Sequence, residues 1–373
     1  MKIYYWSPYL TNIATINSVF RSAKSFAKYD KNKNDIAILN SSGEWDFQKK
    51  NIFNIKIPNL YPFSFYKFLP KEGFIQSRFS FLMIFIINFF PLLKKINKDK
   101  PDYLVVHLLT ILPILLSPIL SKDTKIILRI SGHPKLTIIR KYIWKYFSKF
   151  IHKVTVPTNK TLKFLKKSKI FDNKKIILLR DPVIDPGEIL LNKNKNLPQF
   201  KKKKFFLSVG RLTKQKNFEF LIKMFAKYKS KTDINHLLII GEGEEKVKLT
   251  KLIKELNCQK SIFLLGFKKN VYNYINNCDT LISTAEYEDP GFVLLEAAFL
   301  KKKIISSLVD NGPKEMYQEG NCCNFFKLNN ELSFLKAIKN YKSYDHNKIN
   351  KAYFFSKKFF VLKHFKDFKK ILN

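Results

Sequence analysis

Short runs of apolar residues alternate with longer amphipathic segments along almost the whole chain. Ile3–Trp6, Asp35–Leu39 and Tyr103–His107 are nearly continuous in Val, Ile, Leu and aromatic residues, and they predict strands. Ile13–Ala27 and Phe79–Ile96 instead have the length and spacing of helices. Because apolar strands alternating with helices are typical of parallel sheets covered on both faces, the pattern predicts an α/β fold with doubly wound parallel sheets.

The alternation stops once and then restarts, which predicts two domains. Further strands are expected at Ile126–Ile130, Val154–Val156, Phe205–Val209, Leu237–Ile240, Ile262–Leu265, Thr280–Ser283 and Ile304–Ser307. Residues 181–204 are rich in proline, asparagine and lysine and predict a linker. We therefore expect a Rossmann-like domain at 1–180, a second at 205–345, and a helix at 346–373 that returns to the first domain. The two domains would face a cleft, since such sheets bind ligands beyond the carboxyl ends of their strands.

The composition is that of a globular, strongly basic protein. The net charge is +40, and the basic residues are spread through both halves. Such a charge favours anionic partners but does not choose among nucleic acid, membranes and phosphorylated substrates. The chain has no RNA-binding aromatic signature and no zinc-finger spacing, so we expect no nucleic-acid partner.

Cysteine usage and apolar runs bear on the compartment. The four cysteines form no C-x-x-C pair, and no signal peptide is recognisable at the N-terminus, so reduced thiols in the cytoplasm are expected. The longest apolar run, Phe79 to Leu93, is shorter than the ~20 residues that a bilayer requires. We interpret it as a buried helix.

Two glycine turns follow strands at the start of the second domain. In Ser208-Val-Gly-Arg-Leu-Thr-Lys-Gln-Lys216, Gly210 permits a sharp turn after a strand, and Arg211 and Lys216 project from the loop. A guanidinium can hold a phosphate through two hydrogen bonds, and a lysine adds a point charge. Solvated loop bases are the alternative for this motif alone. The second turn, in Ile239-Ile-Gly-Glu-Gly243, is common in doubly wound folds.

A third motif, "EDPGFVLLE" at 288–296, joins a strand to a helix. Gly291 lets the backbone approach a ligand, and the N–H groups of Phe292, Val293 and Leu294 begin the helix. A helix N-terminus favours anions. Glu288 in the loop and Glu296 in the helix could each accept hydrogen bonds from hydroxyl groups, although a helix cap and a surface acid are the simpler alternative.

Taken together, these spaced motifs resemble the retaining glycosyltransferases of family 4, which have the GT-B fold. The resemblance covers most of the second domain: "SVGRLTKQKN", "LLIIGEGEE", "FLLGF", the two glutamates 288 and 296, and "GPKEMYQEG" at 312–320. It implies that Arg211 and Lys216 contact the donor diphosphate, that Glu296 binds the ribose and that Glu288 binds the transferred sugar. The chain contains no Asp-x-Asp, which fits a class that uses neither metal nor cofactor. Cationic side chains and backbone donors would then stabilise the departing nucleoside diphosphate.

The first domain resembles the family through fewer residues. His133, in "IILRISGHP", falls where the family has a histidine beside the reaction centre, and His107 follows the strand "DYLVVH". The usual glycine-rich loop near the N-terminus is replaced by "SPYLTNIAT", in which Thr11 and Asn12 are candidates for acceptor contacts along with His107. Asp289 and Pro290 replace the glycine that the family has after the loop glutamate, so the sugar pocket differs from the family pattern.

The segment Arg140–Lys153 is expected to form an amphipathic helix. Lysines at 141, 145, 149 and 153 make one stripe, and Ile143, Phe147, Phe150 and Ile151 make the opposite face. A helix of this kind can lie at an anionic membrane surface or simply cover a core.

The sequence therefore predicts a retaining, metal-independent hexosyltransferase. It would move a sugar from a nucleoside diphosphate, with UDP–hexose or UDP–N-acetylhexosamine expected first, to a saccharide or lipid-linked acceptor of surface polysaccharide or lipopolysaccharide. We expect it in the cytoplasm, in peripheral contact with the membrane. Two alternatives stay open: another GT-B enzyme, such as a nucleotide-sugar epimerase, and a basic protein without enzymatic activity that binds nucleic acid or membrane.

Overall fold

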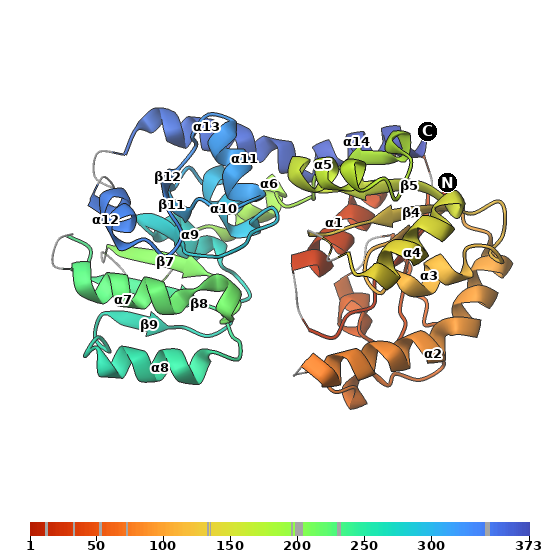
Figure 1. Cartoon of the computed structure of the whole chain (residues 1–373), viewed down its shortest axis with the longest axis horizontal. Helices are drawn as coiled ribbons and strands as arrows, with labels where there is room; N and C mark the ends of the chain where they lie inside the picture. Colours follow the sequence, from red (N-terminus) through yellow and green to blue (C-terminus); the bar gives the residue numbers. More distant parts are fainter. Residues whose placement is uncertain are drawn as a thin grey trace. The chain divides into compact units, whose positions relative to one another are not determined.

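The computed structural model describes residues 1–11, 14–32, 34–51, 54–71, 74–132, 134, 136–194, 197, 204–229, 233–339 and 344–373. The chain forms two compact units (Figure 1). The first contains Met1–Pro182 and Val361–Asn373, and the second contains Val183–Phe360. Each is built around a parallel sheet of six strands.

The first unit has the strand order β2-β1-β3-β4-β5-β6. Its strands are β1 (Lys2–Trp6), β2 (Asp35–Leu39), β3 (Tyr103–Val106), β4 (Lys125–Arg129), β5 (Ile151–Val156) and β6 (Ile176–Leu178). Its helices are α1 (Ala14–Tyr29), α2 (Phe74–Asp99), α3 (Ile111–Leu116), α4 (Ile138–Phe147), α5 (Asn159–Ser168) and α14 (Val361–Leu372).

Alternate residues of β1 enter different cores of this unit. Tyr4 and Trp6 pack with residues of α2, α3, α4 and α5, whereas Ile3 and Tyr5 pack with residues of α1 and α14. Since successive strand side chains point to opposite faces, a strand covered on both sides must be apolar throughout. This is why the strands were recognisable as continuous apolar runs.

The second unit has the order β12-β11-β10-β7-β8-β9. Its strands are β7 (Phe205–Val209), β8 (His236–Ile240), β9 (Ile262–Leu264), β10 (Thr280–Ser283), β11 (Lys303–Ser307) and β12 (Asn324–Phe326). Its helices are α6 (Pro186–Asn192), α7 (Phe218–Tyr228), α8 (Lys246–Glu255), α9 (Tyr272–Asn277), α10 (Phe292–Phe299), α11 (Gly312–Gln318), α12 (Glu331–Lys339) and α13 (His346–Ser356). Helices cover both faces of this sheet as well. The expected doubly wound α/β architecture is confirmed in both units.

Both sheets have a topological switch point, where the strand order turns in opposite directions. In the first unit it lies between β1 and β3, and in the second between β7 and β10. Loops that leave neighbouring strands at such a point diverge to opposite faces of the sheet and open a crevice in which ligands bind. The loops after β1, β3, β7 and β10 are therefore the places to look for a site.

Several expected elements differ from the observed ones. Two edge strands, β6 and β12, were not anticipated; each is three residues long. The stretch 181–204, expected as a linker, contains α6, whose start is capped by the Asp185 side chain. Where one terminal helix was expected at 346–373, the chain forms α13, which lies on α10, and α14, which lies on α1.

The longest helix, α2, corrects the interpretation of the apolar run at 79–93. It spans 26 residues, Phe74–Asp99, because the polar residues that flank the run continue the helix. It is the one helix within the described residues that is long and apolar enough to cross a membrane: within Ile75–Asp99, a window of 18 residues has a mean hydropathy of 1.8, and 28% of that window is buried. The expectation of a buried helix is therefore wrong, since one face of α2 is exposed.

The basic amphipathic segment at 140–153 is also shorter as a helix than expected. Helix α4 ends at Phe147, and Ile151 and Lys153 belong to β5. Trp144 is buried, and Ile143 and Phe147 pack against the same core. This face of the helix therefore covers the sheet.

Candidate functional site

The loops after β7 and β10 meet at the switch point of the second unit. Lys216, at the end of the β7 loop, forms an ion pair with Glu288 of the β10 loop, with 2.6 Å between Nζ and Oε1. Both side chains are largely enclosed, which strengthens their attraction relative to that of a solvated pair. Two of the residues predicted to hold the donor thus lie in direct contact, although 72 positions separate them.

Glycines in the turns after β7 and β8 make room for the Lys216 side chain. A Cβ atom on Gly210 would lie 3.1–3.3 Å from the Cε, Cδ and Cγ atoms of Lys216, so the lysine stem lies across this glycine. On the other side, a Cβ on Gly241 would lie 1.8 Å from the carbonyl oxygen of Gly210. The turns after β7 and β8 therefore pack backbone to backbone, and Leu212 N–H donates to the Glu242 carbonyl at 2.8 Å. Arg211, which follows Gly210 in the turn after β7, is exposed.

Neighbouring polar residues fix the β10 loop. The side-chain amide of Gln215 donates to the main-chain carbonyl oxygen of Tyr287 at 2.8 Å. The main-chain carbonyl oxygen of Gln215 accepts a hydrogen bond from the Glu286 N–H, also at 2.8 Å. The Thr284 hydroxyl donates to the carbonyl oxygens of Lys216 and Asn217. These contacts hold the two loops in one register, which sets the position of Glu288.

A second group supports the loop from the start of α11. The Asn311 amide donates to the Tyr287 hydroxyl at 2.9 Å and to the Asp289 carboxylate at 3.1 Å. Gly312 N–H donates to the Glu288 carbonyl oxygen, and a Cβ at Gly312 would lie 1.7 Å from the Pro290 carbonyl oxygen. Gln215, Tyr287 and Asn311 were not identified from the sequence. "GPKEMYQEG" marked the neighbourhood of Asn311, but not its contact.

Helix α10 begins beside this loop. Gly291 has φ +89°, a left-handed conformation that favours glycine, and no side chain of the described residues caps the helix start. The N–H groups of Phe292, Val293 and Leu294 form the first turn, where intrahelical acceptors are lacking. Glu296 lies one turn further on and is buried. Uncapped N–H groups of a helix start, of the kind that can accept an anion, thus lie next to a buried carboxylate.

Of the first-unit residues predicted to contact the acceptor or the donor sugar, two lie within the described residues. His107 directly follows β3 at the switch point and is buried. Its main-chain N–H donates to the Trp6 carbonyl oxygen at 2.9 Å. Burial, followed by electrostatic contributions from Arg129 and His364, holds the pKa of His107 well below its usual range, so the ring is neutral. Thr11 is exposed at the end of the β1 loop. Asn12 and His133 lie outside the described residues.

A buried polar network lies beside His107 and was not anticipated from the sequence. Arg129, the last residue of β4, pairs with Asp181 at 2.6 Å, and Asp181 also accepts the Ser18 hydroxyl of α1 at 2.7 Å. His364 of α14 contacts the Ser22 hydroxyl at 2.8 Å and the Arg180 carbonyl oxygen at 2.7 Å. Because a carbonyl oxygen only accepts, the Nδ1 atom of His364 carries the proton. The network joins α1, α14 and the carboxyl end of the first sheet.

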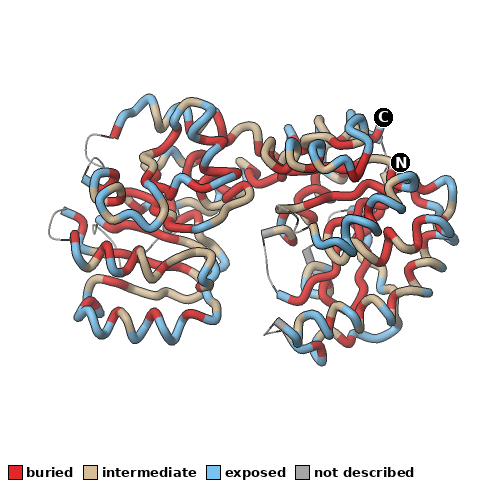
Figure 2. Tube along the Cα trace, viewed as in Figure 1, coloured by how far each residue is buried: buried red, intermediate tan, exposed pale blue. Residues whose placement is uncertain are grey.

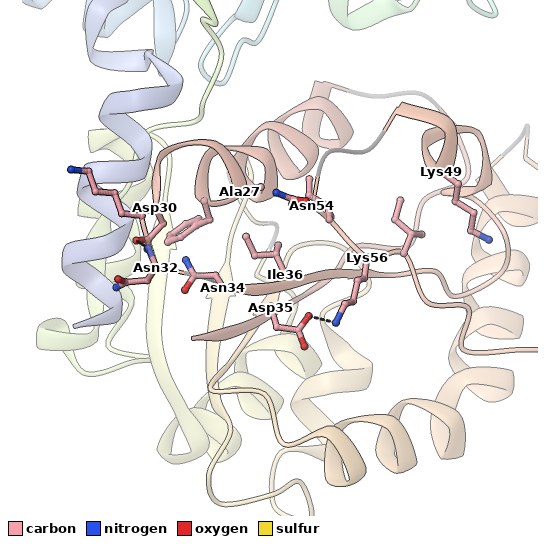
Figure 3. Close-up of a pocket in the computed structure, with 13 residues that line it drawn as sticks. Ala27, Asp30, Asn32, Asn34, Asp35, Ile36, Lys49, Asn54 and Lys56 are labelled. Carbon is pink, nitrogen blue, oxygen red and sulfur yellow. Dashed lines mark hydrogen bonds and ion pairs between the residues drawn. The ribbon is translucent and has the colours of Figure 1, made fainter.

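Another hollow, of about 890 Å³, lies at the opposite, amino-terminal edge of the first sheet (Figure 3). Asp30, Asn34, Asp35 and Lys56 line it, and Asp35 pairs with Lys56 at 2.8 Å. Because doubly wound sheets bind ligands at their carboxyl edge, this hollow is not the donor site. Among the described residues, no group of three or more His, Cys, Asp or Glu side chains is arranged to hold a metal ion.

Comparison with known proteins identifies the class. Residues 191–352 match the family model of the group 1 glycosyl transferases. An uncharacterized glycosyltransferase of Methanocaldococcus jannaschii is 31% identical over 296 residues, which cover 74% of this chain and 68% of that protein. The chain therefore belongs to the group 1 glycosyl transferases and is a glycosyltransferase with the GT-B fold.

Two further similarities are more limited in extent or identity. The N-acetylgalactosamine-N,N'-diacetylbacillosaminyl-diphospho-undecaprenol 4-alpha-N-acetylgalactosaminyltransferase of Campylobacter jejuni is 36% identical over 152 residues, 41% of this chain and 40% of that enzyme. The crystal structure of Anabaena HepE in complex with UDP and glucose superposes with a TM-score of 0.71 at 13% identity, covering 100% of this chain and 99% of that one. The second similarity concerns the fold alone.

Proposed function

We propose that this protein transfers a hexose or N-acetylhexosamine, with retention of anomeric configuration, from a UDP-linked donor to a saccharide or lipid-linked saccharide. The product would belong to surface polysaccharide or lipopolysaccharide, and the reaction would take place at the cytoplasmic side of the membrane. Two similarities support this choice of substrates. The Campylobacter jejuni relative is named for transfer to a diphospho-undecaprenol-linked saccharide, and HepE was crystallised with UDP and glucose.

The contact between Lys216 and Glu288 is the observation that carries the proposal. It brings a cation suited to a diphosphate within 2.6 Å of a carboxylate suited to sugar hydroxyls, at the switch point of the sheet. Arg211 and Lys216 would bind the diphosphate together with the N–H groups of Phe292, Val293 and Leu294. Gly210 and Gly291 would allow its close approach. Glu296 would accept hydrogen bonds from the ribose, and Glu288 from the transferred sugar.

In the proposed reaction the bond between the anomeric carbon and the diphosphate oxygen breaks, and the nucleoside diphosphate leaves with the electron pair. The acceptor hydroxyl forms the new bond on the same face of the sugar and releases its proton. The two cations and the helix N-terminus stabilise the charge that grows on the leaving group, which is the role a metal ion plays in other transferases. His133 would contact the donor sugar, and Thr11, Asn12 and His107 would line the acceptor side.

The test begins with the binding of nucleoside diphosphates and their sugars, followed by transfer to candidate acceptors in the presence of EDTA. We expect Arg211→Ala to weaken UDP binding about 10- to 100-fold, because a charge-assisted hydrogen bond contributes about 1.5–3 kcal/mol. Transfer should fall at least as much. Turnover near that of the wild type in Arg211→Ala would reject the proposal.

Incubation with the donor alone distinguishes the alternative enzyme class. An epimerase converts the donor sugar without an acceptor, whereas a transferase leaves it intact apart from slow hydrolysis. Thermal stabilisation by UDP would in turn contradict a protein that only binds nucleic acid or membrane.

A further inference from the structure

Helix α2 has one face in the core and one face exposed. Ser80, Ile84, Asn88, Leu92 and Ile96 recur every fourth residue and are fully buried. The opposite side carries large apolar side chains with exposed fractions of 53–80%, which we call the α2 outer face: Ile75, Phe79, Leu82, Ile86 and Phe90. Buried and exposed positions accordingly alternate along α2 in Figure 2.

The α2 outer face is narrow, continuous and uncharged. At about 100° per residue, its five members lie within an arc of about 80°. No charged residue occurs from Phe79 to Leu93, whereas Arg78 precedes this stretch and Lys94 and Lys98 follow it. Asp99, at the end of the helix, is engaged by the Tyr4 hydroxyl and by Lys95. The surface is therefore apolar in the middle and cationic at both ends.

An open hollow continues this surface at the C-terminal half of the helix. Leu60, Tyr61, Pro62, Phe90 and Pro91 supply apolar walls, Lys94 and Lys98 add cations, and the volume is about 610 Å³. The ring of Phe63, itself exposed, lies 5.1 Å from that of Tyr61 and extends the apolar area beyond the hollow. Apolar area beside lysines suits a molecule with an acyl chain and an anionic headgroup.

We propose that the α2 outer face docks on the interface of an anionic phospholipid membrane, with the helix axis in the plane of the bilayer. The helix does not cross the bilayer, because its other face is fixed in the core of the first unit. The apolar side chains would enter the boundary between headgroups and acyl chains, and the cations at both ends would meet lipid phosphates. The proposal rests on the first unit alone and does not depend on the donor chemistry proposed above.

Charge favours lipid over a second copy of this chain. A two-fold dimer through the α2 outer face would bring the cationic ends of one helix towards the cationic ends of the other, in a protein whose net charge is already +40. An anionic bilayer instead offers opposite charge along the whole helix.

The experiment measures co-sedimentation of the full chain with vesicles of phosphatidylcholine, with and without phosphatidylglycerol. We expect binding to the anionic vesicles that weakens as salt is raised. The double variant Leu82→Gln/Ile86→Gln should bind the vesicles at least about tenfold more weakly, because two large apolar side chains that would be buried in the membrane are replaced by polar ones. As a control, Leu191→Gln/Val247→Gln changes two apolar residues of the second unit that are even more exposed, and this variant should bind as the wild type does.

A fluorescence readout locates the contact directly. The native tryptophans Trp6, Trp45 and Trp144 are all buried, so Phe79→Trp introduces an exposed indole whose emission should shift to shorter wavelength when anionic vesicles are added. Unchanged vesicle binding of the α2 double variant would overturn the proposal. Absence of vesicle binding by the wild type would also overturn it. If the wild type instead self-associates and the double variant does not, the α2 outer face binds a second copy of the chain and not lipid.

Discussion

At the scale of single residues, the pair formed by Lys216 and Glu288 has to serve two purposes. Without a donor, each side chain neutralises the other across 2.6 Å in a partly enclosed place. In the proposed complex, Lys216 turns to the diphosphate and Glu288 to the sugar hydroxyls. Donor binding must therefore supply interactions that replace the ion pair.

This competition predicts different outcomes for the two partners. Glu288→Gln should reduce transfer by about 100-fold or more while UDP binds as well as before or a few-fold more tightly, because Lys216 loses its competitor. Lys216→Met should instead weaken UDP binding by about tenfold or more. Calorimetric titration with UDP and a steady-state transfer assay separate the two effects.

Lys214→Met is the matched control for these variants. Lys214 lies in the same loop, two residues before Lys216, but is exposed. Its removal should change UDP affinity by less than about threefold, because solvent screens exposed charges. An equal loss of UDP binding in Glu288→Gln and Lys216→Met would contradict the division of roles.

The sequence could locate these residues but not their contact. Gly210, Arg211, Lys216 and Glu288 stood out because each follows a recognisable strand. Which side chains then meet depends on the strand order, which places β7 beside β10 although β8 and β9 intervene along the chain. Asn311 escaped notice for the same reason: its role becomes visible only when α11 is placed against the β10 loop.

At the scale of elements, the turns after β7 and β8 act as one unit. Gly241 has φ +150°, and a side chain there would strike the Gly210 carbonyl oxygen. We expect Gly241→Ala to cost about 1–3 kcal/mol of folding free energy, a lowering of the melting temperature by several degrees. The displaced turn should also weaken UDP binding, which a thermal melt with and without UDP would reveal.

Gly187→Ala tests whether the effect is specific. A Cβ at Gly187 would meet only Asp185 Oδ1 at 3.5 Å, an ordinary contact, and the residue lies in α6. Alanine is the better helix former by about 0.5–1 kcal/mol, so this variant should melt at the same temperature or higher. Equal destabilisation by both substitutions would exclude the packing explanation for Gly241.

Fold prediction succeeded where local pattern and burial agree. Phe205–Val209 and Thr280–Ser283 were predicted with the observed bounds, because central strands of a covered parallel sheet are apolar on both faces. Of the three-residue edge strands, β9 was predicted but β6 and β12 were missed, because so few residues carry little pattern. The exposure of α2 was missed because a run that is apolar all round normally indicates burial, and nothing in it marks which face a neighbour leaves uncovered.

At the scale of the whole molecule, we expect the stability in acid to depend on buried histidines. Burial, followed by smaller contributions that include the nearby charge of Arg129, lowers the pKa of His364 from about 6.5 to about 4. The folded protein therefore holds the neutral ring, while the unfolded chain takes up a proton below about pH 6.5. The stabilisation is complete above that pH and is lost as pH falls towards 4, by about 3 kcal/mol for this residue.

Urea denaturation at several pH values between 7 and 4 measures this slope. His364→Gln removes the titration but keeps hydrogen-bonding groups, so its stability should fall less steeply over the same range. Some slope should remain, because the pKa of His107 is lowered in the same sense. Parallel profiles for wild type and His364→Gln would show that other groups govern acid unfolding.

The path of the chain has a consequence for its synthesis. Phe365, Phe368 and Leu372 of α14 complete the core that α1 and β1 begin, yet the whole of Val183–Phe360 is translated between them. On a ribosome that adds about 5–20 residues per second, the earliest-made half waits with an uncovered apolar face while the later-made half can already fold. The nascent first unit is therefore a natural client for chaperones, and it matures last although it emerges first.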